Sequence, residues 1–69
     1  MSEVVLQPGD TLLDVHEVKR IVGLSTATIY RRMKAREFPL CAHIAPRSVR
    51  WLESEVKAWV SQKLQVRRA

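Results

Sequence analysis

The chain has 69 residues, of which 46% are hydrophobic and 28% are charged, and a net charge of +5 at pH 7. This composition excludes an intrinsically disordered chain, and the length allows one small domain. No apolar run approaches the roughly 20 residues that cross a membrane, and the apolar stretch near the N-terminus is too short for a signal peptide, so we expect a cytoplasmic protein.

The two ends of the chain differ from its middle. Residues 1–11 contain Pro8-Gly9 and show little periodicity, which indicates an N-terminal arm or a first short strand. Residues 65–69 also lack periodicity and contain Arg67-Arg68, so we interpret them as a basic tail. The folded domain is therefore expected over residues 12–64, with Leu12-Leu13 as an apolar anchor at its start.

A short helix is predicted over residues 15–22. Asp14 is expected to cap it, because Glu17 stands three positions later, which is the spacing of a capping box. Gly23 is expected to end it, since the residue after a helix often adopts the left-handed conformation. Apolar residues recur at i, i+3 and i+7 and predict a buried face, with Ile21 beside them; they are Val15, Val18 and Val22.

A second helix is predicted over residues 26–36, capped by Ser25. The connection between the two helices is the short segment Gly23-Leu24-Ser25, and a tight turn with glycine is typical of a helix-turn-helix. Ile29 and Met33 are four residues apart and are expected to face the first helix. The opposite side is wide and cationic; it holds Thr28, Arg31 and Ala35, flanked by Arg32 and Lys34.

A β-hairpin is predicted after the second helix. Phe38-Pro39 is expected to stop that helix, because the residue before proline avoids helical backbone. Leu40–Ile44 and Val49–Leu52 are expected to pair as strands across the turn formed by residues 45–48. The alternation of a strand places Val49 and Trp51 on one face, and Ser48 and Arg50 on the other.

A third helix is predicted over residues 53–64. Its first turn contains acidic residues, which the helix dipole favours. Val56, Trp59 and Val60 form its apolar stripe, and Lys63 is able to extend over them. We interpret Trp51 and Trp59 as core residues rather than base-stacking platforms, because each lies on the apolar face of its element.

Neither a metal site nor a catalytic site is predicted. The single cysteine, Cys41, excludes an internal disulfide, and its neighbour His43 has no second ligand pair to complete a zinc site. We expect Cys41 to be a small, at least half-buried hydrophobe. Because the spacing suggests no nucleophilic triad, phosphate loop or apolar carboxylate pair, we expect no enzyme activity and no cofactor.

The whole net charge lies in residues 31–50, which contain six basic side chains and one acidic side chain, Glu37, whereas the rest of the chain is neutral. A neutral scaffold with one cationic face is expected to meet a polyanion. This window spans the end of the second helix and the hairpin, so we predict a mainly α, winged helix-turn-helix fold that contacts DNA with both. The expected DNA contacts are Ser25, Thr26, Thr28, Tyr30, Arg31, Arg32, Lys34, Arg47, Ser48 and Arg50.

Each of these residue types also has a structural interpretation. Ser25 and Thr28 can cap the second helix, and paired arginines can form a solvated face. A solvated face normally mixes positive and negative charges, however, whereas the charged side chains of residues 31–50 are almost entirely positive. Tyr30 is interpreted either as a core residue with its hydroxyl at the rim or as a phosphate donor.

Seven short segments stand in a specific order and spacing over about residues 12–60. They are Leu12-Leu13, Glu17-Val18, Gly23-Leu24-Ser25, Thr28-Ile29-Tyr30-Arg31, Glu37-Phe38-Pro39, Pro46-Arg47-Ser48-Val49-Arg50-Trp51 and Glu55-Val56-Lys57-Ala58-Trp59. Together they resemble the AlpA family of small phage and prophage regulators. The run Gly-Leu-Ser…Thr-Ile-Tyr-Arg, with Phe-Pro and Arg…Trp downstream, is quite specific, whereas any one piece alone is weak.

The resemblance implies a winged helix-turn-helix related to excisionases and MerR-type domains. Family members activate an integrase gene or act as excisionases, so the implied partners are double-stranded DNA at an operator or attachment site, an integrase or recombinase, and further copies along the DNA. Ser25, Thr28, Tyr30 and Arg31 match the recognition helix, and Arg47 and Arg50 match the wing. The family often has glycine before the Pro-Arg of the wing, where this chain has Ala45.

Two other functions remain open at this point. A protein that uses its basic face to inhibit an acidic protein partner has the same net charge. An RNA-binding protein would need exposed aromatic side chains on which bases stack, and the one phenylalanine and one tyrosine both look structural.

Overall fold

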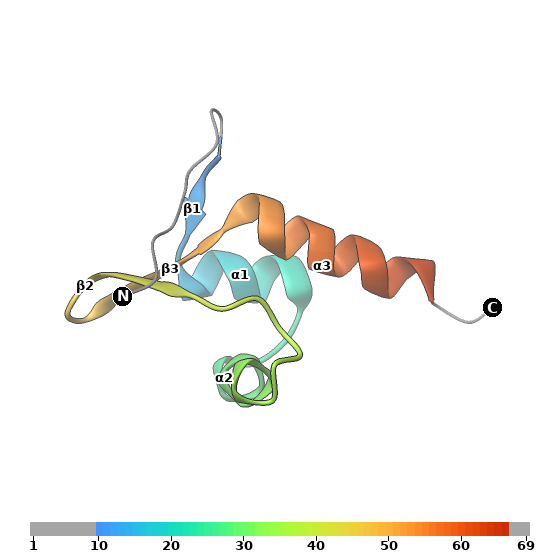
Figure 1. Cartoon of the computed structure of the whole chain (residues 1–69), viewed down its shortest axis with the longest axis horizontal. Helices are drawn as coiled ribbons and strands as arrows, with labels where there is room; N and C mark the ends of the chain where they lie inside the picture. Colours follow the sequence, from blue (N-terminus) through green and yellow to red (C-terminus); the bar gives the residue numbers. More distant parts are fainter. Residues whose placement is uncertain (1–9, 67–69) are drawn as a thin grey trace.

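The computed structural model describes residues 10–66. The expected N-terminal arm, apart from residues 10–11, and Arg67-Arg68 lie outside the described residues. The elements in chain order are β1 (Leu12–Leu13), α1 (Val15–Val22), α2 (Thr26–Lys34), β2 (Ala42–Ala45), β3 (Ser48–Leu52) and α3 (Glu53–Gln65). The fold is a winged helix-turn-helix, as predicted, and the hairpin and α3 extend in opposite directions from its centre (Figure 1).

The sheet has three strands in the order β1-β3-β2, all antiparallel to their neighbours. The prediction of a two-stranded hairpin was therefore incomplete, since Leu12-Leu13 is a strand as well as an apolar anchor. Leu12 pairs with Leu52 and Leu13 with Trp51. The N–H of Glu53 also donates to the carbonyl of Thr11 at 2.9 Å. A two-residue strand is too short to show alternation, so only its partner β3 defines it.

Helix α1 has the predicted bounds and both predicted caps. The Glu17 N–H donates to Oδ1 of Asp14 at 2.9 Å, and the Asp14 N–H donates to Oε1 of Glu17 at 3.2 Å. Gly23 has φ of 72° and donates its N–H to the carbonyl of Lys19. Val18 is fully buried, as predicted. Ile21 was expected beside the buried face, but it is 39% exposed and lies at the surface.

Helix α2 begins after Ser25 as predicted but ends at Lys34, two residues earlier than expected. The cause is Arg36, which has φ of 60°. Its N–H donates to Met33 and the N–H of Glu37 donates to Arg32, at 3.0 and 2.8 Å. This pair of bonds closes a helix with a left-handed residue, a position that usually holds glycine. The chain therefore leaves the helix before Phe38-Pro39 could stop it.

Replacing Arg36 with glycine is expected to stabilise the domain by about 0.5–1 kcal/mol, because a left-handed backbone is unfavourable for a residue with a Cβ atom. Urea unfolding monitored by circular dichroism measures the change. The matched control is Arg36→Ala, which removes the same charge but keeps the Cβ atom, and it should leave stability within about 0.5 kcal/mol of wild type. Equal effects of both substitutions would attribute the change to charge rather than to backbone strain.

The hairpin is tighter than predicted. β2 begins at Ala42 rather than Leu40, and Leu40 is 59% exposed. Ala45 pairs with Ser48, so the connection is Pro46-Arg47 rather than residues 45–48. The register shifts between His43 and Ala45, which makes Ile44 an extra residue that is 54% exposed. A bulge of this kind increases the twist of its strand. The turn sequence has no Asn-Gly pair, so it did not predict the position of the bulge.

The core lies where β3, α1, α2 and α3 meet. Trp51 is fully buried, and its indole N–H donates to the carbonyl of Pro39 at 3.1 Å. Trp59 is half-buried, donates to the carbonyl of Glu37 at 2.9 Å and meets Phe38 edge to face at 4.8 Å. Both tryptophans are thus core residues, as predicted. The buried core residues among those described are Leu13, Val18, Ile29, Phe38, Trp51 and Val56.

Helix α3 extends one residue beyond the prediction and ends at Gln65. The Lys63 ammonium lies 5.3 Å from the Trp59 ring centroid, which confirms that this side chain extends over the apolar stripe. Cys41 is half-buried against the core, and burial raises the pKa of its thiol. Among residues 10–66, no helix is long and apolar enough to cross a membrane.

Candidate nucleic-acid interface

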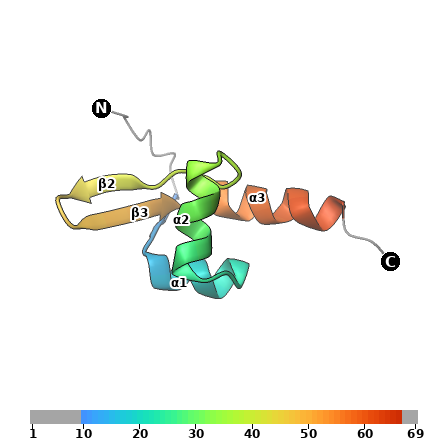
Figure 2. The ribbon, with the colours of Figure 1, turned by 90° about the horizontal axis from the view of Figure 1, so that it is seen from below.

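Helix α2 separates a buried face from a cationic one. Ile29 is fully buried and Met33 packs partly buried against the same core, as predicted. Arg31 and Lys34 are exposed on other sides of the helix, and Arg32 is half-buried. Figure 1 shows α2 below the other elements, and Figure 2, which views the molecule from below, shows α2 in front of them. The long cationic side chains are therefore placed on the element that the fold presents at its surface.

A chain of hydrogen bonds links three predicted contacts on α2. Ser25 Oγ accepts the backbone N–H of Thr28 at 3.2 Å, so Ser25 is the helix cap. Ser25 Oγ also donates to Thr28 Oγ1 at 2.9 Å. Arg31 Nη2 donates to the same Thr28 oxygen at 3.2 Å. The capping role expected of Ser25 is present. The Thr28 hydroxyl instead bonds to Ser25 Oγ and Arg31 Nη2, and it holds the guanidinium of Arg31 against the helix.

Tyr30 combines the two interpretations that the sequence left open. Its ring meets the Trp51 ring edge to face, with centroids 6.2 Å apart. The residue nevertheless remains 42% exposed. Tyr30 therefore covers the edge of the core and still presents part of its side chain to solvent.

The two wing arginines differ in their surroundings. Arg47 is exposed in the two-residue turn of the hairpin. Arg50 is half-buried and donates from Nη1 to the carbonyl of Val49 at 2.8 Å. The pKa of Asp14 is lowered, mainly by the backbone N–H of Glu17 and to a smaller extent by Arg50. One N–H group of Arg50 is thus engaged within the domain, while Arg47 is exposed to solvent.

Opposing charge is scarce around α2. Within the part of the chain that the structure describes, the ion pair that forms is Lys57–Glu53 on α3, at 3.6 Å. No acidic side chain there lies within ion-pair distance of Arg31, Arg32 or Lys34. Unneutralised cations on one face raise the local positive potential, which attracts a polyanion. The predicted residues on α2 and in the hairpin are all exposed or half-buried.

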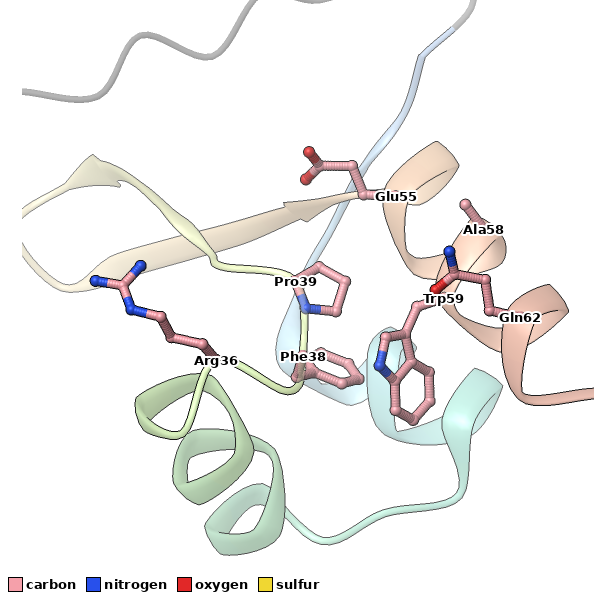
Figure 3. Close-up of a pocket in the computed structure, with 7 residues that line it drawn as sticks. All are labelled: Arg36, Phe38, Pro39, Glu55, Ala58, Trp59 and Gln62. Atoms are coloured by element: carbon pink, nitrogen blue, oxygen red, sulfur yellow. The ribbon is translucent and has the colours of Figure 1, made fainter. Parts of the chain in front are cut away.

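A groove that the sequence did not reveal lies beyond the C-terminal end of α2 (Figure 3). Its volume is about 350 Å³. Phe38, Pro39 and Trp59 form its apolar part, with the charged groups of Arg36 and Glu55 at its edges. It joins residues of α3 to the loop after α2, so no local periodicity could indicate it. No three metal-ligating side chains among residues 10–66 lie together.

Comparison with known proteins adds two findings. A family model described as "Prophage CP4-57 regulatory protein (AlpA)" matches residues 11–64. "Uncharacterized protein ORF88" of Enterobacteria phage P4 is 38% identical over 55 residues. The matched region is 80% of this chain and 62% of that relative, so the chain spans about three fifths of the relative's length. The family match includes both α2 and the hairpin.

Proposed function

Because this chain belongs to the AlpA family of prophage regulatory proteins, we propose that it regulates by binding double-stranded DNA at specific sequences. The observation that carries the proposal is the exposed cationic side of α2, with hydroxyl groups at its start and, among the described residues, no acid within ion-pair distance of its cations. A recognition helix needs such side chains, because they reach base edges and phosphates in the major groove.

In this proposal α2 enters the major groove and the hairpin contacts the backbone or the adjacent minor groove. Arg31 reads bases, whereas Lys34 and Arg47 contact phosphates. Arg50 contributes less to DNA binding than Arg47, because it is half-buried and one of its N–H groups is engaged with the carbonyl of Val49. The full proposed surface is Ser25, Thr26, Thr28, Tyr30, Arg31, Arg32, Lys34, Arg47, Ser48 and Arg50.

The proposed biological role is control of a mobile element, through integrase expression, through excision as a recombination directionality factor, or both. A single module of this kind buries only about 600–1,000 Å² on DNA. Useful affinity then requires several sites, contacts between copies along the DNA, or contact with the recombinase. The proposed partners are accordingly an operator or attachment site, the integrase, and further copies of this chain.

Footprinting of the purified protein over its element's attachment site and integrase promoter tests the proposal. Several phased protected sites near the recombination core would identify an excisionase, and protection confined to the promoter would identify a transcriptional regulator. Absence of protection at both, at moderate salt, would reject specific DNA binding and favour an acidic protein as the partner.

Salt dependence provides a quantitative prediction. If about four to six phosphates are neutralised, log K should fall with log salt at a slope of about −4 to −5. Fluorescence anisotropy with a labelled duplex across a salt series measures the slope. The variant Lys34→Ala should make the slope shallower by about 0.9, because one phosphate contact is lost. A slope near zero for the wild type would contradict a phosphate-binding surface.

A further inference from the structure

Arg31 occupies an unusually open position on α2. At about 100° per residue, the positions four before and four after it lie on the same ridge of the helix, and these are Ala27 and Ala35. All three residues are exposed. No long neighbour along the ridge therefore covers the guanidinium, and the small alanine side chains let the helix backbone approach a surface closely.

The guanidinium is also held in place before any ligand binds. Arg31 Nη2 donates to Thr28 Oγ1 at 3.2 Å, and Thr28 Oγ1 accepts a second bond from Ser25 Oγ at 2.9 Å. An arginine has five N–H donors, so most of them stay available on the fork. A side chain that is already ordered loses less rotamer freedom on binding than a free one.

We propose that Thr28 is a positioning residue, which holds Arg31 so that it reads a guanine in the major groove. The inference rests on the proposed function. Guanine presents two acceptors there, N7 and O6, and these match two N–H groups of an arginine fork. Adenine and cytosine each present an amino donor, which repels such a fork. The target site thus contains a G·C pair opposite Arg31 whose recognition depends on the Thr28 hydroxyl.

The test uses a duplex selected from a random-sequence pool by binding to the full wild-type chain. Each guanine is replaced in turn by 7-deazaguanine, which keeps base pairing but removes the N7 acceptor. Binding is compared for wild type, Thr28→Val and Thr28→Ser. Valine keeps the branched shape without the hydroxyl, and serine restores the hydroxyl. Circular dichroism checks that each variant is folded.

For wild type, one guanine position should lose roughly tenfold or more in affinity on replacement. Thr28→Val should bind the unmodified duplex more weakly than wild type does. Replacing the sensitive guanine with 7-deazaguanine should then cost Thr28→Val less than half of the fold-loss in affinity that it costs wild type, whereas Thr28→Ser should show the full loss. The same loss in Thr28→Val as in wild type would overturn the inference, and so would equal weakening on selected and random duplexes. Specific binding without any sensitive guanine would overturn it while leaving the proposed function intact; absence of specific binding would reject both.

Discussion

The Trp51→Ala variant is expected to be largely unfolded at temperatures where the wild-type chain is folded. Trp51 is the largest fully buried side chain, and it joins β3 to the core residues of the helices. Truncating a buried tryptophan to alanine costs about 3–5 kcal/mol. A domain of this length has a total stability of about 3–10 kcal/mol at the usual 0.05–0.15 kcal/mol per residue. The loss is therefore comparable to the whole free energy of unfolding.

Far-ultraviolet circular dichroism and thermal denaturation measure this effect. The variant Trp51→Phe keeps an aromatic ring but loses the N–H that donates to Pro39, and it should be destabilised by less than Trp51→Ala. A second comparison is Trp59→Ala, at a half-buried position, which should also cost less. A cooperative transition for Trp51→Ala within 1 kcal/mol of wild type would show that the core does not depend on this side chain.

The second large effect concerns Arg31→Ala, which is expected to remove most of the preference for a selected duplex over random DNA. Loss of a bidentate contact to a base reduces discrimination by about 1–3 kcal/mol, which is roughly five- to 150-fold. Binding to random DNA should fall far less, because only one of several charges is lost. Competition between labelled selected duplex and unlabelled random duplex measures the ratio directly.

Lys34→Ala is the matched control on the same helix, since Lys34 is also an exposed cation. It should weaken binding to selected and random duplexes by the same factor, because a phosphate contact carries no sequence information. Both variants remove exposed side chains, so their stability should stay within about 0.5 kcal/mol of wild type. Equal, sequence-blind losses in both would reject α2 as the element that reads bases.

The groove between α3 and the loop after α2 shows why a site built from distant segments is hard to predict. Phe38 was expected to help stop a helix and to be structural, and it is 5% exposed; its contact with Trp59 from α3 was not predicted. Arg36 was expected inside α2, yet its left-handed backbone ends that helix and places it at the groove. Nothing in the local pattern distinguishes these positions, because each depends on a partner more than ten residues away or on a backbone conformation that arginine seldom adopts.

The sequence by itself determined the elements whose hydrogen bonds are local. The Asp14–Glu17 capping box, the left-handed Gly23 and the Ser25 cap all join residues within four positions of each other. The concentration of positive charge in residues 31–50 can be read directly from the sequence. Tertiary structure alone decided the rest: β1 exists only because β3 pairs with it, and the hairpin bulge follows from cross-strand register. Local sequence patterns suffice to predict hydrogen bonds between residues within about one helical turn of each other. Strand pairing and its register depend on contacts that form only when distant segments come together.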